Sequence, residues 1–296
     1  MRQRWLGRSG LVVLDALPAA AIASRNRSAI RWRWRALGAG LALLLAGGAS
    51  AADRGADGRF EKRTSAHFVL YQDVDIDEAG GFRGSRRFEQ ELLSELERAY
   101  DRLGALLGLR PSQPIEVVVY DPGVFDASFA GRFRFPAAGF YHGVIRIRGD
   151  VQLTAPLSRV LHHELVHAAL HQEAPNLAWP GWFNEGVAEW FEARVVGKRH
   201  LATGEAVALA RARDAGQLLP LSTLWAPGFG RLGPQAAQLA YLQSYGMIEW
   251  VAGRFGERAL RDLCEEVART RDVERSLRRT TRLGSADLEA GFLGEL

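Results

Sequence analysis

The 296-residue sequence predicts an α+β fold, a small mixed sheet with helices followed by a mainly helical C-terminal lobe. The β-rich segments are confined to the stretch before residue 149, where a helical pattern separates the first of them from the rest. The segments after residue 154 have helical spacing or contain prolines that end a helix. Strands that come first and helices that follow alone indicate an α+β lobe joined to a helical lobe.

The first 51 residues differ in composition from the rest of the chain and look like an export signal. They hold eight arginines and one acid, Asp15, and the basic stretch leads into the apolar run 36–46. Ala49-Ser50-Ala51 then offers the small residues that a signal peptidase prefers, so we expect cleavage after Ala51. The apolar run is too short to span a bilayer comfortably. If the segment were kept, it would anchor the chain, and the tryptophans and arginines of 31–35 would suit a membrane interface.

The net charge depends on this segment. The whole chain has 38 basic and 34 acidic residues, whereas residues 52–296 hold 30 and 33, a net charge of −3. The high pI of the full sequence therefore gives no support to nucleic-acid binding, which needs a basic patch on the folded domain. Cys264 is the only cysteine, so no intramolecular disulfide can form and a hydrophobic core must supply the stability. We expect an exported protein, periplasmic or secreted, whose mature chain does not span a membrane.

Residues 52–174 are expected to form the α+β lobe. Apolar residues at helical spacing predict its first helix, which Gly108 and Pro111 end. The β-rich run 115–120 predicts a buried strand, and the alternation in 144–148 predicts a strand at the edge of the sheet. The expected order is a strand within 60–72, a helix over 84–107, a strand over 115–120, a loop over 124–138 and a strand within 139–148.

Residues 175–296 are expected to form the helical lobe, so that 52–296 make one domain of two lobes. Thr154 before Pro156 predicts where the preceding helix starts, because proline is tolerated in a first turn. Pro175 and Pro180 end that helix. The helices expected afterwards run from about 181 to 192, over 203–217, 235–254 and 257–268, and in a short pair at 273–279 and 285–293.

The helix that starts after Thr154 contains His163-Glu164-Leu165-Val166-His167. Two histidines four positions apart lie on the same face of a helix, so both imidazoles can reach one cation. Zinc suits this pair, because catalytic zinc sites combine three protein ligands with one open position, and His, His and Glu are a known ligand set. Glu164 lies about 100° round the helix from His163, where it need not bind the cation and can accept a proton from the attacking water.

Three arrangements for the third ligand can be compared. His171 lies about 12 Å along the helix axis from the first histidine of the motif, too far to share one ion with it. A compact three-histidine motif requires Gly and His three and six residues after His167, where this chain has Leu170 and Glu173. Glu185 remains, because a turn can bring a second helix antiparallel beside the first and point this carboxylate at the two imidazoles.

Two neighbours of Glu185 are candidates to support the site. Glu189, one turn further on, could accept the distal N–H of a ligating histidine and so fix the orientation of its ring. The alternative is that Glu189 is a solvated helical carboxylate. Asn184 could also support a ligand, or it could only cap the second helix.

The motif 163–167, followed by Trp182-Phe183-Asn184-Glu185-Gly186-Val187-Ala188-Glu189, resembles the gluzincin metallopeptidases, most closely the bacterial peptidase MA-like group. The resemblance covers roughly residues 60–260, judged by the order of elements as well as by the motifs. It implies a zincin-like fold, in which the helix of the first motif is the active-site helix. It also implies one Zn²⁺ per chain, held by His163, His167 and Glu185, with Glu164 as the general base and a peptide or protein as substrate.

The substrate class depends on the segment before the first motif. Gluzincin aminopeptidases carry a Gly-x-Met-Glu-Asn type sequence there, whose glutamate holds the substrate amine. The corresponding stretch, Gly139-Phe140-Tyr141-His142-Gly143, has no glutamate, so aminopeptidase specificity is not supported. The expected edge strand, with Val144, Ile145 and Arg146, could instead bind an extended peptide by backbone pairing, which suits internal cleavage.

Gluzincins also use a Tyr or His to stabilise the tetrahedral oxyanion, and the resemblance points to the segment 240–245. Tyr241 is the first candidate and Tyr245 the second, although aromatic residues four apart on an amphipathic helix also pack in cores. The sequence thus predicts a zinc-dependent peptidase, and an endopeptidase rather than an aminopeptidase. The alternative is a gluzincin-like domain that binds zinc for structure, or presents its groove to a peptide without cleaving it.

Overall fold

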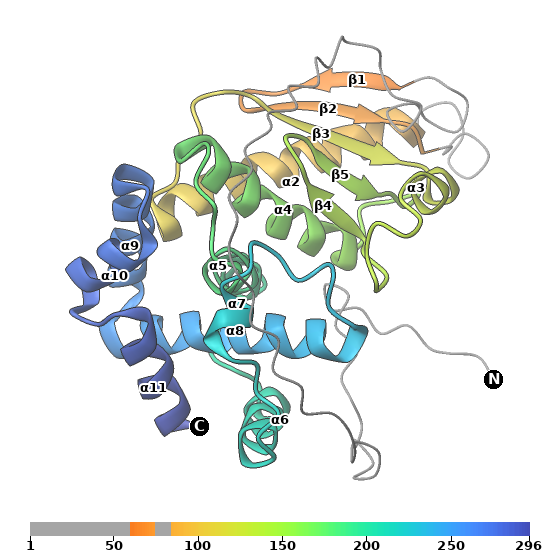
Figure 1. Cartoon of the computed structure of the whole chain (residues 1–296). Coiled ribbons are helices and arrows are strands. Elements are labelled where there is room, and N and C mark those ends of the chain that lie inside the picture. Colours follow the sequence, from red (N-terminus) through yellow and green to blue (C-terminus); the bar gives the residue numbers. More distant parts are fainter. Residues whose placement is uncertain (1–59, 75–83) are drawn as a thin grey trace, which may run out of the picture.

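The computed structural model describes residues 60–74 and 84–296, in which a small sheet lies beside a larger group of helices (Figure 1). The expected signal segment 1–51 lies outside the described residues. The first part of the fold consists of β1 (Glu61–Thr64), β2 (Phe68–Gln72), α2 (Gly84–Leu107), β3 (Ile115–Tyr120), α3 (Pro122–Ser128), β4 (Gly139–Tyr141), β5 (Ile145–Arg148) and α4 (Ala155–Glu173). The predicted helix over 84–107 and the strand over 115–120 are therefore confirmed.

The sheet has the strand order β1-β2-β3-β5-β4. Strands β2, β3 and β5 run parallel, and β1 and β4 pair antiparallel at the two edges. The predicted edge strand is wrong in one respect, because segment 139–148 folds into a hairpin that places β5 inside the sheet. Ile145 pairs with Val117 on one side and with Tyr141 on the other. Gly143 has a φ of 73° in the hairpin turn, a left-handed conformation that glycine adopts without steric cost.

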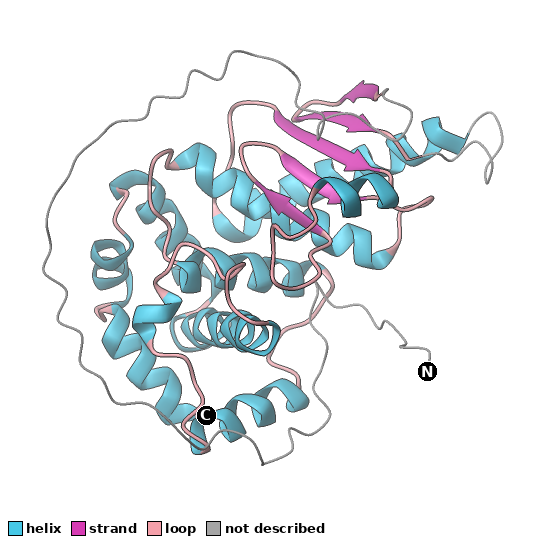
Figure 2. Cartoon of the chain, turned by 45° about the vertical axis from the view of Figure 1, so that its right-hand side comes forward, coloured by secondary structure: helices cyan, strands magenta, loops and turns pink. Residues whose placement is uncertain are grey.

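The two faces of the sheet are covered unequally. Side chains that alternate along β3 point to opposite faces, so Val117 and Val119 join the large core beneath α2 and α4. Val118 and Tyr120 join a smaller aromatic cluster with Phe125 of α3. Figure 2 shows α2 and α4 along one face of the sheet and the short α3 on the other, where it is the only helix among the described residues. One face of the sheet therefore supports α4, the helix that carries the first motif.

Helix α3 replaces the first part of the loop predicted over 124–138. The Asp121 carboxylate accepts hydrogen bonds from the backbone N–H groups of Gly123 (2.8 Å) and Val124, and Pro122 occupies the first turn. These are the ordinary signals of a helix start. The same Asp-Pro-Gly letters also fit a turn that ends a strand, which explains the error.

The second part of the fold is helical, as predicted. It consists of α5 (Gly181–Val195), α6 (Thr203–Asp214), α7 (Leu221–Leu224), α8 (Pro234–Phe255), α9 (Glu257–Thr270), α10 (Val273–Thr281) and α11 (Ser285–Glu295). The single turn α7 was not predicted. Helix α8 packs closely on α5 at Gly186, where a Cβ atom would lie 2.5 Å from the Ser244 carbonyl oxygen. A glycine at this position therefore sets the spacing of the two helices.

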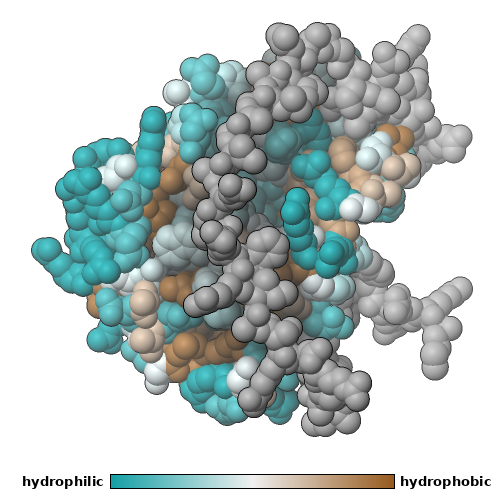
Figure 3. Space-filling view, viewed as in Figure 1, coloured by the Kyte–Doolittle hydropathy of each residue, from teal (hydrophilic) through white to brown (hydrophobic). Residues whose placement is uncertain are grey.

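The outer surface of the helical part is hydrophilic over α9 and α10 (Figure 3). Arginine and glutamate side chains pair along these helices, for example Arg269 with Glu266 and Arg278 with Glu274. Cys264 faces inward and is fully buried in the main core. Among the helices of the described residues, none is long and apolar enough to cross a membrane.

Candidate metal centre

Helices α4 and α5 position the two sequence motifs. Thr154 caps α4 and its side chain accepts a hydrogen bond from the Leu157 N–H. The chain leaves α4 at Ala174 and enters α5 after Pro180. Residues late in α4 contact residues early in α5, and residues early in α4 contact residues late in α5, so the two helices run antiparallel. This is the arrangement that the spacing of the motifs predicts.

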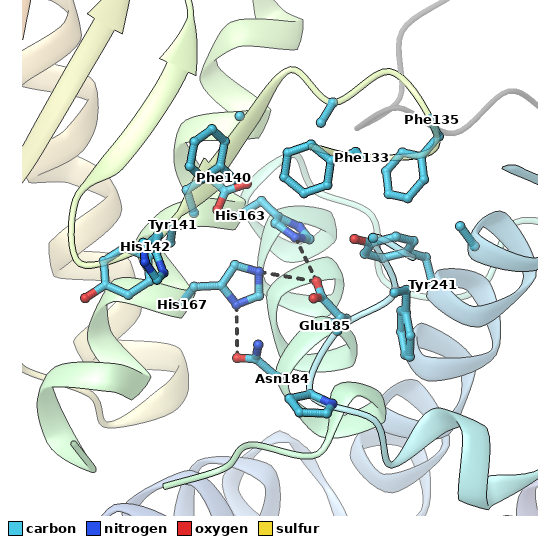
Figure 4. A pocket seen from close by; sticks show the side chains of 18 of the residues that line it. Phe133, Phe135, Phe140, Tyr141, His142, His163, His167, Asn184, Glu185 and Tyr241 are labelled. Carbon is cyan, nitrogen blue, oxygen red and sulfur yellow. Dashed lines mark hydrogen bonds and ion pairs between the residues drawn. The ribbon is translucent and has the colours of Figure 1, made fainter. Parts of the chain in front are cut away.

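His163, His167 and Glu185 converge between the two helices (Figure 4). The Nε2 atoms of both histidines lie 3.3 Å from Oε2 of Glu185. Ligand atoms of a tetrahedral zinc site, each bonded at about 2.0–2.1 Å, are separated by about 3.3 Å. Two imidazole nitrogens and a carboxylate also form a ligand set that zinc favours. The three residues therefore fit a zinc ion in both spacing and chemistry.

The electrostatics of this site favour a positive charge between the three side chains. Burial alone would lower the pKa of His163, but contacts with Glu185 and the neighbouring carboxylates raise it well above its usual value. The pKa of His167 is raised in the same way, against the effect of burial, by Glu185. Burial would raise the pKa of Glu185, yet the two histidines lower it to about 2. The carboxylate is thus ionised at neutral pH and available as a ligand.

Glu164 lies beside this group but contacts it differently. Its side chain is buried, and its Oε2 atom has no hydrogen-bond partner in the part of the chain that the structure describes. Burial raises the pKa of this carboxyl, while the nearby His167 and His163, and to a smaller extent a hydrogen bond from the Tyr141 backbone, oppose the rise. A carboxylate in such surroundings binds a proton more readily than one in water. These are properties that a general base requires.

Asn184 contacts the predicted ligand His167 and does not cap α5. Its Oδ1 atom accepts a hydrogen bond from Nδ1 of His167 at 3.0 Å. The N-cap position of α5 is occupied by Pro180, four residues earlier. The hydrogen bond leaves Nε2 of His167 unprotonated in the neutral imidazole, as a metal ligand must be.

Behind His163 lie two carboxylates, of which the sequence interpretation named only Glu189. Oxygen atoms of Glu189 and Glu192 are each 3.7 Å from Nδ1 of His163. Arg159 donates a hydrogen bond to Glu192 at 2.6 Å. Helical spacing could have indicated both missed residues, because Glu192 follows Glu185 by two turns and Arg159 precedes His163 by one.

The three predicted ligands line a cleft of about 790 Å³. Glu164, Glu189 and Asn184 also line it, together with aromatic residues from the segment before β4, the strand β4 itself and the N-terminal half of α8. Figure 4 shows Phe133, Phe135 and Phe140 on one side of the site and Tyr241 across from His163.

The two tyrosine candidates lie in different surroundings. Tyr241 lines the cleft, with its ring centroid 6.4 Å from that of His163 and 5.4 Å from that of Phe229. Burial and the nearby Glu185 raise its pKa well above the usual value, so the phenol keeps its proton and can donate a hydrogen bond. Tyr245 does not line the cleft, and the Lys198 ammonium lies 4.4 Å from the centre of its ring. The structure thus brings Tyr241, and not Tyr245, to the cleft.

The predicted peptide-binding residues Val144, Ile145 and Arg146 do not line the cleft. Strand β5 is paired on both sides, so its backbone has no free edge for a peptide. Gly139, Phe140 and Tyr141 of β4 line the cleft instead. The cleft is therefore lined by the other strand of the hairpin, and peptide binding by Val144, Ile145 and Arg146 has no support from their position.

Comparison with known proteins finds little similarity to this chain. No family model matches its sequence, and no curated protein matches it either. Among solved structures, the chain is similar to a crystal structure of a two-domain M1 zinc metallopeptidase, a point mutant bound to L-arginine, with 14% identity and a TM-score of 0.41. The similarity covers 80% of this chain and 51% of the metallopeptidase, so this chain spans about half of its length. The function must therefore be inferred from the geometry of the site itself.

Proposed function

We propose that this protein is a zinc-dependent peptidase with one Zn²⁺ per chain. The observation that carries the proposal is the convergence of His163, His167 and Glu185 beside Glu164 on the wall of an open cleft. A structural zinc site would be closed by a fourth protein ligand, whereas three ligands facing a cleft leave one position for water or substrate.

Each step of peptide-bond hydrolysis has a group at this site that can perform it. Zinc at this site would polarise the substrate carbonyl and lower the pKa of water to about 7. Glu164 takes the proton of the attacking water and passes it to the leaving amine. Tyr241, which is protonated at neutral pH, donates a hydrogen bond to the oxyanion that develops on the carbonyl.

Strand β4 is the element suited to hold the substrate backbone. The Ala138 carbonyl and the His142 N–H form hydrogen bonds with residues on the β5 side. Because backbone groups alternate in direction along an antiparallel strand, those of Gly139 and Tyr141 point away from β5. The Tyr141 N–H already donates to Glu164, so an extended peptide could pair with the backbone of Gly139 and the Tyr141 carbonyl and pass along the cleft. The segment 139–143 has no carboxylate to hold a free amine, which supports internal cleavage rather than removal of N-terminal residues.

Substitution Glu164→Gln tests the catalytic part of the proposal. The variant should bind zinc as the wild type does, because Glu164 is not one of the ligands. Its turnover of an unfolded protein such as casein should fall by about 10²–10⁴-fold, the usual contribution of a general base. Glu116→Gln, which changes an exposed carboxylate of β3, is the matched control and should keep full activity.

Zinc content by elemental analysis and casein cleavage with and without a chelator complete this test. A zinc-loaded Glu164→Gln protein with wild-type turnover would exclude Glu164 as the base. Zinc without chelator-sensitive cleavage of any peptide would exclude a peptidase and leave a peptide-binding or structural zinc domain. Peptides with acetylated N-termini should be cut as fast as free ones if the enzyme cleaves internally.

We also propose that the protein is exported, to the periplasm or outside the cell, with cleavage after Ala51. The support is the basic, apolar and small-residue pattern of residues 1–51. Mass spectrometry of the protein from the exporting organism tests this, because a mature N-terminus at Ala52 is expected. A retained segment would indicate a membrane-anchored form.

A further inference from the structure

Two buried polar atoms face each other behind His163, on the side away from its ligand atom. Nδ1 of His163 and Oε2 of Glu192 are both buried, and neither has a hydrogen-bond partner among residues 60–74 and 84–296. They lie 3.7 Å apart. Native interiors rarely leave a donor and an acceptor unpaired, and a shift of about 1 Å or less would bring these two within hydrogen-bond distance.

Arg159 fixes the other end of the Glu192 carboxylate. Its guanidinium contacts Oε1 through both Nε, at 2.6 Å, and a terminal nitrogen. The Glu192 side chain is 1% exposed, so Arg159 supplies the countercharge that a buried carboxylate needs. Arg159 and His163 are one turn apart on α4, while Glu192 comes from α5. The ion pair therefore holds the carboxylate beside the imidazole from across the helix interface.

We propose that Glu192, held by Arg159, positions His163 for the metal by accepting the hydrogen bond of its Nδ1–H. A proton fixed on Nδ1 leaves Nε2 free to bind zinc, and the hydrogen bond sets the direction in which that nitrogen points. Asn184 does the same for His167, so each imidazole has its own partner. The inference rests on the zinc site of the proposed function, but not on peptide hydrolysis.

Glu189 is the competing residue, because its carboxylate is also 3.7 Å from Nδ1 of His163. The two glutamates differ in their surroundings. Glu189 lines the cleft, whereas Glu192 does not and is fixed by Arg159. The competing role for the pair is a second cation site, since ligand atoms of His163, Glu189 and Glu192 lie within 4.8 Å of one another. The positive charge of Arg159 on Glu192 opposes a second cation there.

Zinc affinity, measured by competition with a chromophoric chelator, tests the proposal without requiring any activity. Glu192→Gln should weaken zinc binding by about 10–100-fold, and Glu189→Gln by less than about threefold. The absorption spectrum of the cobalt-substituted protein should change in Glu192→Gln, because the orientation of one ligand changes. Glu249→Gln is the matched structural control, since it breaks the buried Arg194–Glu249 pair of α5 and α8 without touching His163. It should lower stability and leave zinc affinity unchanged.

Arg159 provides a second variant that keeps the proposal testable if Glu192→Gln fails to fold. Arg159→Met should weaken zinc binding in the same direction, and Arg159→Lys should restore most of it. Wild-type zinc affinity in Glu192→Gln or in Arg159→Met, or a larger loss in Glu189→Gln, would overturn the proposal. Two metal ions per wild-type chain would also overturn it. If affinity falls as expected but no peptide is cleaved, the proposed function fails while this inference stands.

Discussion

The glutamates of this site differ from one another in pKa, and the tyrosines of α8 differ in position, because their surroundings differ. Glu185 is ionised and faces both imidazoles, whereas burial raises the pKa of Glu164 one helix away. The two tyrosines of α8 also differ in their surroundings, although residues four positions apart lie on nearly the same side of a helix. Tyr241 points into the cleft, and Tyr245 is buried against Lys198. Position within the fold, rather than residue type, thus decides the surroundings and the pKa of each side chain.

Substitution Tyr241→Phe should reduce kcat by about 10²–10³-fold with little change in KM, because the lost hydrogen bond forms only with the developing oxyanion. Steady-state kinetics on a fluorogenic peptide would measure both parameters. Tyr245→Phe is the control, and its kcat should stay close to that of the wild type. A larger loss in Tyr245→Phe would assign the oxyanion to the other tyrosine.

At the scale of elements, the site depends on how closely α8 and α4 approach their neighbours. Gly186 lets α8 lie against α5, and Tyr241 is three residues from Ser244 at that contact. On the other side, α2 is tied to α4 by Glu95, which accepts hydrogen bonds from His162 (2.8 Å) and Ser158 (2.5 Å). These contacts set where α8 and α4 lie relative to α5 and α2.

Gly186→Ala should destabilise the protein by about 1–3 kcal/mol, because the new methyl group would meet the Ser244 backbone and the two helices must separate. Urea unfolding followed by circular dichroism would measure the loss. Gly253→Ala, on the exposed side of α8 with open space around it, is the control and should gain up to about 1 kcal/mol from helix propensity. Equal stability of the two variants would show that the close contact is unimportant.

The Glu95 contacts should make stability depend on pH. The hydrogen bond from His162 lowers the pKa of Glu95 below its ordinary value, although burial opposes it. A carboxyl whose pKa is lower in the folded state stabilises the fold fully above its unfolded pKa of about 4.3, and less as pH falls below it. Wild type should therefore exceed Glu95→Gln in unfolding free energy at pH 6, and the gap should shrink toward pH 3. A gap that grows on acidification would contradict this sign.

At the scale of the whole molecule, the proposed metal site lies between the two predicted lobes. His163 and His167 belong to α4, which packs under the sheet, and Glu185 belongs to α5, the first helix of the helical part. A ligand that binds only the folded chain stabilises it, and the gain in unfolding free energy grows with the logarithm of the ratio of free ligand concentration to Kd. Zinc bound here would therefore stabilise the contact between the lobes, whether or not the site is catalytic.

Removal of zinc by a chelator should lower the Tm, since zinc at 100 times its Kd contributes about 2.7 kcal/mol, or roughly 5–10 °C for a domain of this size. Differential scanning calorimetry with and without chelator would measure the shift. Glu185→Gln, which removes the carboxylate ligand, should show a much smaller shift. An unchanged Tm in the wild type would mean that zinc does not bind the folded chain.

The sequence by itself determined the features that depend on local periodicity. The spacing of His163, Glu164 and His167 placed three groups correctly on one helix, and Thr154, Pro175 and Pro180 marked its ends. Helical spacing and the resemblance together selected Glu185, and the structure brings it to both imidazoles. Long helices such as 84–107 were predictable because their apolar residues recur in the sequence with a period of 3.6 residues.

The tertiary structure decided what depends on contacts between distant segments. Which strand of the hairpin forms the sheet edge is a matter of pairing partners, and so β4 rather than Val144–Arg146 faces the cleft. The choice between Tyr241 and Tyr245 depends on the rotation of α8, which its packing on α5 at Gly186 sets. Glu192 and Arg159 meet only because α4 and α5 run antiparallel. Periodicity places side chains on one helix, but only packing decides which of them meet across two.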